Sequence, residues 1–130
     1  APRQADIVGH GARGYKLISF LNRRSGLSAS EFQYHYENGH GPLVRSTEIF
    51  AQSLKTYRQH YCDPDEEFNL ATGQPELFID GSSELHFVSE NAFMKCFHWE
   101  GYADSIGADE DRFLTKPTMR FMVREKIVIG

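Results

Sequence analysis

The sequence is poor in the features that define several broad classes of protein. Only two of its 130 residues are cysteines, Cys62 and Cys96, too few for a disulfide framework or a zinc knuckle. No apolar run approaches the roughly 20 residues that a membrane-spanning helix needs, and the sequence contains no signal-peptide core. We therefore expect free thiols, a cytoplasmic location and no membrane partner.

Clustered basic residues and metal-ligand spacings are also missing. The formal net charge is −4, with acidic and basic residues interspersed. Binding to a phosphate backbone needs a basic stripe or patch, so nucleic acid is not an expected partner. The six histidines and two cysteines form no H-x-H, H-E-x-x-H or C-x-x-C pattern, and we expect no metal site.

Aromatic residues, by contrast, make up 13% of the chain and suit a core, a subunit interface or a pocket for a flat ligand. The length fits one domain, which we place at residues 15–130 after a flexible lead-in at 1–14. The lead-in contains a G-x-G-x-x-G pattern at 9–14. This pattern indicates dinucleotide binding only when it follows a strand, and here it precedes the first one, so we expect no cofactor.

The first half of the domain has clear local signals. Residues 15–22 are apolar and partly β-branched, which predicts a strand. Ser28 and Glu31 have the spacing of a capping box, which predicts a helix from Ser28 to about Asn38. Gly39 is expected to end that helix in the left-handed conformation.

The next three residues, His40-Gly41-Pro42, predict a sharp corner. Pro42 suits the first position of a second helix, which the apolar spacing extends to Leu54. Residues 63–80 form a long irregular connection, either a lid or a surface excursion. The other expected elements are strands at 55–61, 83–88 and 118–129, a helix starting at Ser89 and short helical turns at 99–116. This order is the split βαβ arrangement of an α+β, ferredoxin-like fold.

Strand alternation over 83–88 predicts which residues share a face. Leu85 and Phe87 point one way, and Glu84, His86 and Val88 point the other way. Helices cover only one face of such a sheet, so the other face must find a partner. We expect a homodimer, with a pocket beneath the sheet that includes Glu84 and His86.

Two separated stretches of the sequence resemble the EthD family. The first is Arg23-Arg24-Ser25-Gly26-Leu27-Ser28 with Glu31-Phe32, followed by His40-Gly41-Pro42-Leu43-Val44. The second is Asp80-Gly81 with Glu84-Leu85, followed by Ala108-Asp109-Glu110 and Arg112-Phe113. The resemblance covers about residues 15–129. It implies a dimeric α+β barrel without a cofactor, in a superfamily of polyketide cyclases, dehydratases, decarboxylases, muconolactone-type isomerases and quinone-forming monooxygenases.

Two histidines are the candidate catalytic residues, because histidine titrates near neutrality. His40 matches the histidine of the family's H-x-P-L corner, and its alternative role is to brace that corner by hydrogen bonds. His86 is placed on the helix-free face by alternation, and its alternative role is structural. Family members often have Trp at the position of His86.

Five further residues are expected to bind substrate or to hold a developing enolate: Tyr36, Tyr57, Tyr61, Glu84 and Arg120. The leading hypothesis is a cofactor-independent lyase or cyclase, acting as a dehydratase or decarboxylase on an aromatic or polyketide-derived intermediate of secondary metabolism. The alternatives are a cofactor-free anthrone-type monooxygenase and a non-catalytic dimeric binding protein.

Overall fold

The computed structural model describes residues 15–63, 66–73 and 79–130; the predicted lead-in at 1–14 and its glycine pattern lie outside this part. A four-stranded antiparallel sheet has the order β2-β3-β1-β4. Its strands are β1 (Lys16–Leu21), β2 (Leu54–Tyr61), β3 (Gly81–Phe87) and β4 (Met119–Val123). With helices between β1 and β2 and between β3 and β4, this is the predicted ferredoxin-like α+β fold.

The register of the central strands fixes which side chains share a face. Leu17 of β1 is paired with Leu85 of β3, and Lys16 is paired with His86. Since successive side chains point to opposite faces, the leucines lie on the helix side and Lys16 and His86 on the helix-free side. The predicted alternation of β3 is thus confirmed, although Val88 lies just beyond the end of the strand.

The first helical segment begins where the sequence predicts and ends differently. Ser28 Oγ accepts the Glu31 backbone N–H at 3.1 Å, and Glu31 Oε1 accepts the Ser28 backbone N–H at 2.8 Å. This capping box starts α2 (Ala29–His35), which runs into a π-helical turn, η1 (Tyr36–His40), and then α3 (Gly41–Ser46). The predicted left-handed stop at Gly39 and the corner after it are therefore wrong.

A specific hydrogen bond explains why the chain stays helical through η1. The Gly41 backbone N–H bonds to the Tyr36 carbonyl, five residues back, which is the pattern of a π turn. Gln59 Nε2 of β2 donates a second hydrogen bond to the same carbonyl at 2.8 Å. The second predicted helix is divided instead at Thr47, whose backbone is extended, and α4 (Glu48–Ser53) follows.

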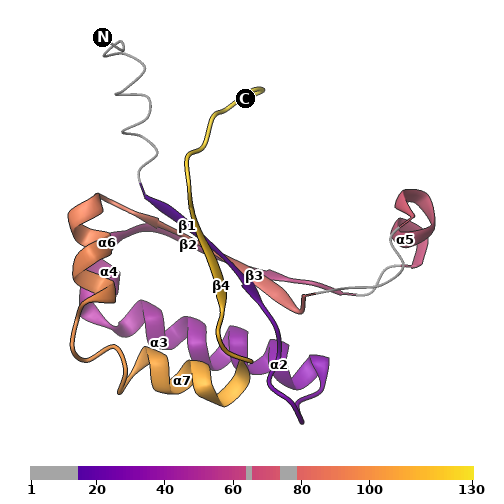
Figure 1. Cartoon of the computed structure of the whole chain (residues 1–130), viewed down its shortest axis with the longest axis horizontal. Helices are drawn as coiled ribbons and strands as arrows, with labels where there is room; N and C mark the ends of the chain where they lie inside the picture. Colours follow the sequence, from indigo (N-terminus) through magenta and orange to yellow (C-terminus); the bar gives the residue numbers. More distant parts are fainter. Residues whose placement is uncertain (1–14, 64–65, 74–78) are drawn as a thin grey trace.

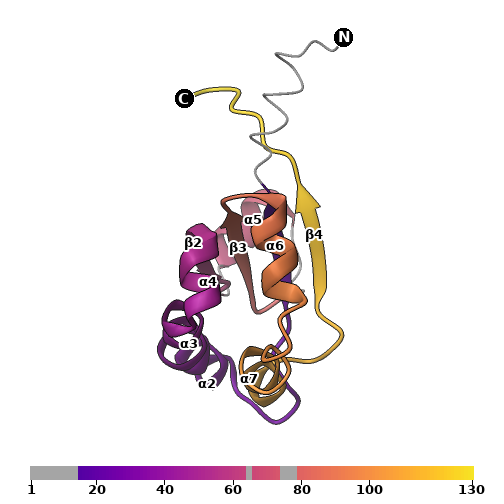
Figure 2. The same ribbon diagram turned by 90° about the vertical axis from the view of Figure 1, so that its left-hand side faces the viewer.

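The helices of the second half are α6 (Glu90–Phe97) and α7 (Ile106–Phe113). Figures 1 and 2 show these helices and α2 to α4 on the same side of the sheet. The connection from β2 to β3 contains α5 (Glu66–Thr72), which the sequence analysis did not predict. In Figure 1, α5 lies at the far end of the sheet, away from the helices that cover it.

The last strand is shorter than the predicted strand at 118–129. β4 ends at Val123 because its neighbour β1 begins at Lys16, directly opposite. Residues 124–130 then leave the sheet (Figure 1) and are exposed. Among the described residues, the apolar, β-branched end of the sequence therefore has no strand to pair with.

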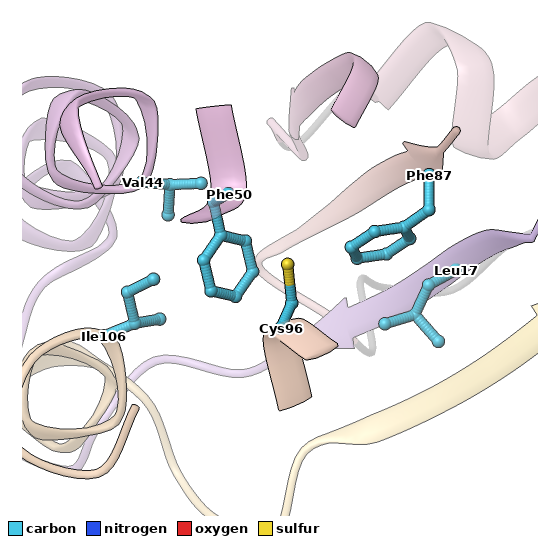
Figure 3. Close-up of a cluster of buried hydrophobic side chains, with 6 residues drawn as sticks. All are labelled: Leu17, Val44, Phe50, Phe87, Cys96 and Ile106. Carbon is cyan, nitrogen blue, oxygen red and sulfur yellow. The ribbon is translucent and has the colours of Figure 1, made fainter. Parts of the chain in front are cut away.

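The core lies between the sheet and the helices. One buried cluster joins both sheet and helices and is shown in Figure 3: Leu17, Val44, Phe50, Phe87, Cys96 and Ile106. A second cluster surrounds Phe32 and Phe113. Phe50 and Phe87 are almost fully buried, and truncating such a side chain typically costs about 3–5 kcal/mol. Cys96 is a buried free thiol, as the sequence predicts.

Candidate active site

A small cavity of about 40 Å³ lies between the sheet and the helices. Ser19 of β1 and Ser83 of β3 are paired in the centre of the sheet and both line the cavity. Their short side chains leave space beneath the helices, and larger aromatic rings enclose that space. Those rings include Tyr36, Tyr57, Phe97, Tyr102 and Phe113.

This cavity lies in a different place from the pocket that the sequence analysis expects. The pocket was expected on the helix-free face, with Glu84 and His86. The cavity lies instead on the helix-covered face, because the small Ser19 and Ser83 side chains point that way. Glu84 and His86 consequently do not line it.

Among the described residues that line the cavity, His40 is the only histidine. Its side chain is 9% exposed, and Nδ1 lies 2.8 Å from Asp109 Oδ2. Within the described part of the chain, Nε2 has no hydrogen-bond partner. Burial lowers the pKa of His40 and outweighs the opposing hydrogen bond to Asp109. The geometry therefore assigns a neutral imidazole with its proton on Nδ1 and a lone pair on Nε2.

Asp109 of α7 is the carboxylate that holds this ring. It is 4% exposed, and its other oxygen, Oδ1, lies 2.9 Å from His35 Nε2 and 3.4 Å from Arg112 Nη1. Burial acts to raise the pKa of Asp109, but the hydrogen bonds from His40 and His35 outweigh it and the pKa is lowered. Asp109 is therefore ionised and can stabilise a positive charge on His40.

The next residue, Glu110, organises a second polar group at the cavity. Its Oε2 accepts hydrogen bonds from Tyr102 Oη and from Arg120 Nη2, both at 2.9 Å. Glu110 is 6% exposed, and Lys116 Nζ lies 3.5 Å from Oε1. This ion pair fixes the Arg120 guanidinium at the cavity wall, where it can donate to a ligand oxygen.

Two tyrosines form the wall nearest β2. Tyr36 Oη donates to the Ser82 carbonyl at 2.7 Å, which anchors its ring against β3. Tyr57 Oη accepts a hydrogen bond from Gln59 Nε2 at 2.9 Å. Burial raises the pKa of Tyr57 to about 12, so its hydroxyl stays protonated near neutral pH and can act as a donor.

An outer groove of about 690 Å³ lies beside the cavity and shares Val44 and Tyr57 with it. Tyr61 lines this groove rather than the cavity, and its ring contacts that of Tyr36 edge-on at 5.7 Å. Val44 and Tyr57 are therefore the side chains that separate the cavity from the groove.

The helix-free face carries its own polar network around the two remaining predicted site residues. Glu84 pairs with Lys16 Nζ and with His60 Nε2, each at 3.1 Å. The pKa of His86 is lowered by partial burial and by the nearby charges of Lys55 and Lys16. The structure thus brings together Tyr36, His40, Tyr57 and Arg120, and it places Glu84 and His86 on the opposite side of the sheet.

Asp109 and Glu110 were missed as site residues, although the sequence contains a signal for them. Ile106, Asp109, Glu110 and Phe113 follow the i, i+3, i+4, i+7 spacing of a buried helix face, and all four are buried in α7. Two carboxylates at core positions need partners. That pattern would have directed attention to a buried ionic site.

Comparison with known proteins agrees with this architecture. Residues 24–117 match the EthD domain family. The chain belongs to this family. No curated protein shows significant sequence similarity to it.

Solved structures from two bacteria and a plant share the fold of this EthD-domain protein. An ethyl tert-butyl ether d (EthD) family protein from Bacillus halodurans is 17% identical, with a TM-score of 0.62 over 85% of this chain and 97% of that chain. A dimeric protein of unknown function from Bacteroides fragilis, described as having a ferredoxin-like fold, is 7% identical, with a TM-score of 0.54 over 83% and 94%. A hypothetical Arabidopsis thaliana protein is 13% identical, with a TM-score of 0.55 over 88% and 92%.

Two further observations concern metals and membranes. Residues 15–63, 66–73 and 79–130 include no group of three or more His, Cys, Asp or Glu side chains placed to hold a metal ion. No helix of this EthD-domain protein, in the same described part, is long and apolar enough to cross a membrane.

Proposed function

We propose that this EthD-domain protein is a cofactor-independent lyase or cyclase that uses His40 as its general base and acid. The single observation that carries the proposal is the buried, neutral His40, held through Nδ1 by Asp109 and unpartnered at Nε2 among the described residues. A base needs a free lone pair and a partner for the charge it gains. His40 has both.

The same groups support a dehydration in two steps. His40 Nε2 removes a proton from a carbon next to a substrate carbonyl, and Asp109 stabilises the resulting imidazolium. Arg120, with Tyr57, donates hydrogen bonds to the enolate oxygen that develops. The imidazolium then returns its proton to a departing hydroxyl, which leaves as water. In a decarboxylase, His40 Nε2 would first take the proton of the substrate carboxyl group, and the resulting imidazolium would protonate the carbanion that remains after carbon dioxide is lost.

The cavity walls support an aromatic or polyketide-derived substrate, because six of the residues that line the space around His40 carry aromatic rings. The cavity itself, at about 40 Å³, has room for only one or two water molecules. Tyr57 and Val44 must therefore move for an aromatic substrate to enter from the outer groove.

The proposed protein is a homodimer formed through the helix-free face of the sheet. Phe20 and Phe121 lie on this face, with ring centroids 5.5 Å apart, and are 38% and 43% exposed. Met119 is also exposed there, at 59%. Such an apolar patch on a sheet favours a partner surface, and the Bacteroides fragilis protein of the same fold is described as dimeric.

The experiment compares His40→Gln with His86→Phe on a panel of aromatic β-hydroxyketones and β-keto acids, following water loss by absorbance and carbon dioxide release. We expect His40→Gln to lower turnover at least about 100-fold, the usual cost of losing a positioned base. His86→Phe, which places an aromatic ring at the position, is expected to stay near wild type. Circular dichroism melts check that both variants fold.

Two results would overturn the proposal. Loss of activity in His86→Phe with full activity in His40→Gln would place the reaction on the helix-free face, as the sequence alone suggests for His86. Stoichiometric oxygen uptake during turnover would identify the monooxygenase alternative instead.

A further inference from the structure

Two histidines share one buried carboxylate at the cavity. His40 Nδ1 lies 2.8 Å from Asp109 Oδ2, and His35 Nε2 lies 2.9 Å from Asp109 Oδ1. The side chain of His40 is 9% exposed, whereas that of His35 is 31% exposed. One carboxylate therefore connects the enclosed ring to a ring that meets solvent.

The surrounding structure holds both rings in place. His35 ends α2 and His40 ends η1, and both rings contact Phe113, at centroid distances of 4.9 and 5.0 Å. A Cβ at Gly39 would lie 3.1 Å from the His35 ring, so a glycine at this position lets the ring lie against the turn. His35 also lines a separate surface groove with Arg112 and Phe113.

We propose that His35 is a positioning residue that fixes the Asp109 carboxylate toward His40 and couples the charge of the His40–Asp109 pair to the external pH. Its consequence for turnover rests on the function proposed above. The coupling itself is a property of the three side chains and does not depend on a substrate.

The direction of the coupling follows from the charges. A protonated His35 neutralises Asp109 and repels a positive charge on His40, so His40 resists protonation. A neutral His35 leaves the full charge of Asp109 to stabilise the His40 imidazolium. When two ionisable groups interact in this way, the titration curve of each shows more than one protonation step. The other titratable or charged side chains around the pair are Glu31, Tyr34, Tyr36, Glu110 and Arg112.

Three variants separate the two parts of the proposal in the full-length protein. His35→Gln keeps a donor for Asp109 Oδ1 but cannot titrate. His35→Phe keeps a ring against Phe113 but removes both the donor and the titration. His60→Gln is the matched control, because His60 also pairs with a carboxylate, Glu84, and is 43% exposed, on the opposite face of the sheet.

The measurement is an NMR titration of the imidazole of His40, with hydrogen exchange of its Nδ1–H. In His35→Gln we expect the midpoint of the His40 titration to rise and the curve to become that of a single site. In His35→Phe we expect the same rise, and exchange of the Nδ1–H about tenfold faster, which corresponds to the loss of one hydrogen bond to a charged group. His60→Gln should leave both readouts of His40 unchanged.

An unchanged His40 titration in His35→Gln would overturn the coupling. Unchanged exchange in His35→Phe would overturn the positioning role. Both readouts are obtained without substrate, so either failure is distinct from failure of the proposed function, which only the turnover of His40→Gln decides.

Discussion

Asp109 and Glu110 show how two adjacent carboxylates can serve different partners. Asp109 binds two histidines, whereas Glu110 binds Arg120 and Tyr102. The first arrangement would favour a positive charge on His40 in the proposed proton transfer, and the second holds the permanent positive charge of Arg120. Both carboxylates are buried, so each needs its partners to offset the cost of losing water.

The acid sensitivity of the fold follows from these groups. Burial lowers the pKa of His40 below its ordinary value of 6.5, so the unfolded chain takes up this proton at a higher pH than the folded protein. The free energy of unfolding should therefore decrease as the pH falls from 6.5 toward the lower pKa of the folded state. Asp109, whose pKa is also lowered, adds a loss of stability in the same direction at still lower pH.

We therefore expect the midpoint of thermal unfolding to fall less steeply with acidification in His40→Gln than in wild type. Melting curves between about pH 7 and 5, just around the ordinary pKa of histidine, measure the difference. The exposed His98→Gln is a control of the same chemical change. Equal slopes in His40→Gln and wild type would mean that His40 is protonated as readily in the folded protein as in the unfolded chain.

The sequence identified some of the residues that line the cavity, but it did not predict on which face of the sheet the cavity lies. His40, Tyr36, Tyr57 and Arg120 were selected from the sequence and line the cavity. His86 was given the correct face of β3, but alternation cannot tell which face encloses a cavity. The position of the cavity depends on the distance between the helices and the Ser19 and Ser83 side chains, and that distance is set by tertiary packing.

At the scale of elements, η1 is the feature that shapes the site. Its irregular hydrogen bonding leaves the Tyr36 carbonyl with two donors, the Gly41 backbone N–H and Gln59 Nε2. A Cβ on Gly41 would lie only 2.8 Å from Gln59 Nε2. The glycine therefore allows β2 to support the turn that carries His40.

We expect Gln59→Leu to destabilise the protein by about 1–2 kcal/mol, since it removes side-chain hydrogen bonds to partly buried partners. The exposed Gln52→Leu is the matched control, because Gln52 bonds only to Glu48 on the surface of α4. Urea unfolding curves compare the two variants. Similar midpoints for both would show that η1 does not depend on Gln59.

The helices show which structural features local sequence patterns can predict and which they cannot. The capping box at Ser28 was predicted because both of its hydrogen bonds are encoded within four residues. The π turn was missed because Gly39 and Pro42 favour a break, whereas a hydrogen bond from β2 supports a continuous helix. The irregular connection at 63–80 concealed α5, because the described side chains of this helix are exposed and no buried apolar stripe marks it in the sequence.

At the scale of the whole molecule, the sheet has two unlike faces. The helix side contains the core and the cavity, while the helix-free side carries aromatic side chains near β4 and an ionic network around Lys16, Glu84 and His60. These charged groups are paired with one another within the chain. Burial of the exposed aromatic rings against a second subunit is therefore the main stabilising contribution that this face can make to a dimer.

We expect Phe121→Glu to convert the proposed dimer to a monomer. Burying an unpaired carboxylate in an apolar interface costs several kcal/mol, which at micromolar concentration is enough to separate the subunits. Met94→Glu is the matched control, because Met94 is 41% exposed on α6 and Phe121 is 43% exposed on β4. Sedimentation velocity measures the result, and a wild-type monomer at micromolar concentration would remove the dimer from the proposal.

Ser82 gives the two faces a thermodynamic connection. Its carbonyl accepts the hydroxyl of Tyr36 from the cavity side, and its Oγ lies 2.6 Å from His60 Nδ1 on the helix-free side. Any shift of Tyr36 that accompanies ligand entry would therefore disturb Ser82, which lies on the face proposed to form the subunit contact. Linkage requires the effect to be reciprocal: the factor by which ligand changes subunit affinity is the factor by which assembly changes ligand affinity. Substrate affinity would then depend on protein concentration.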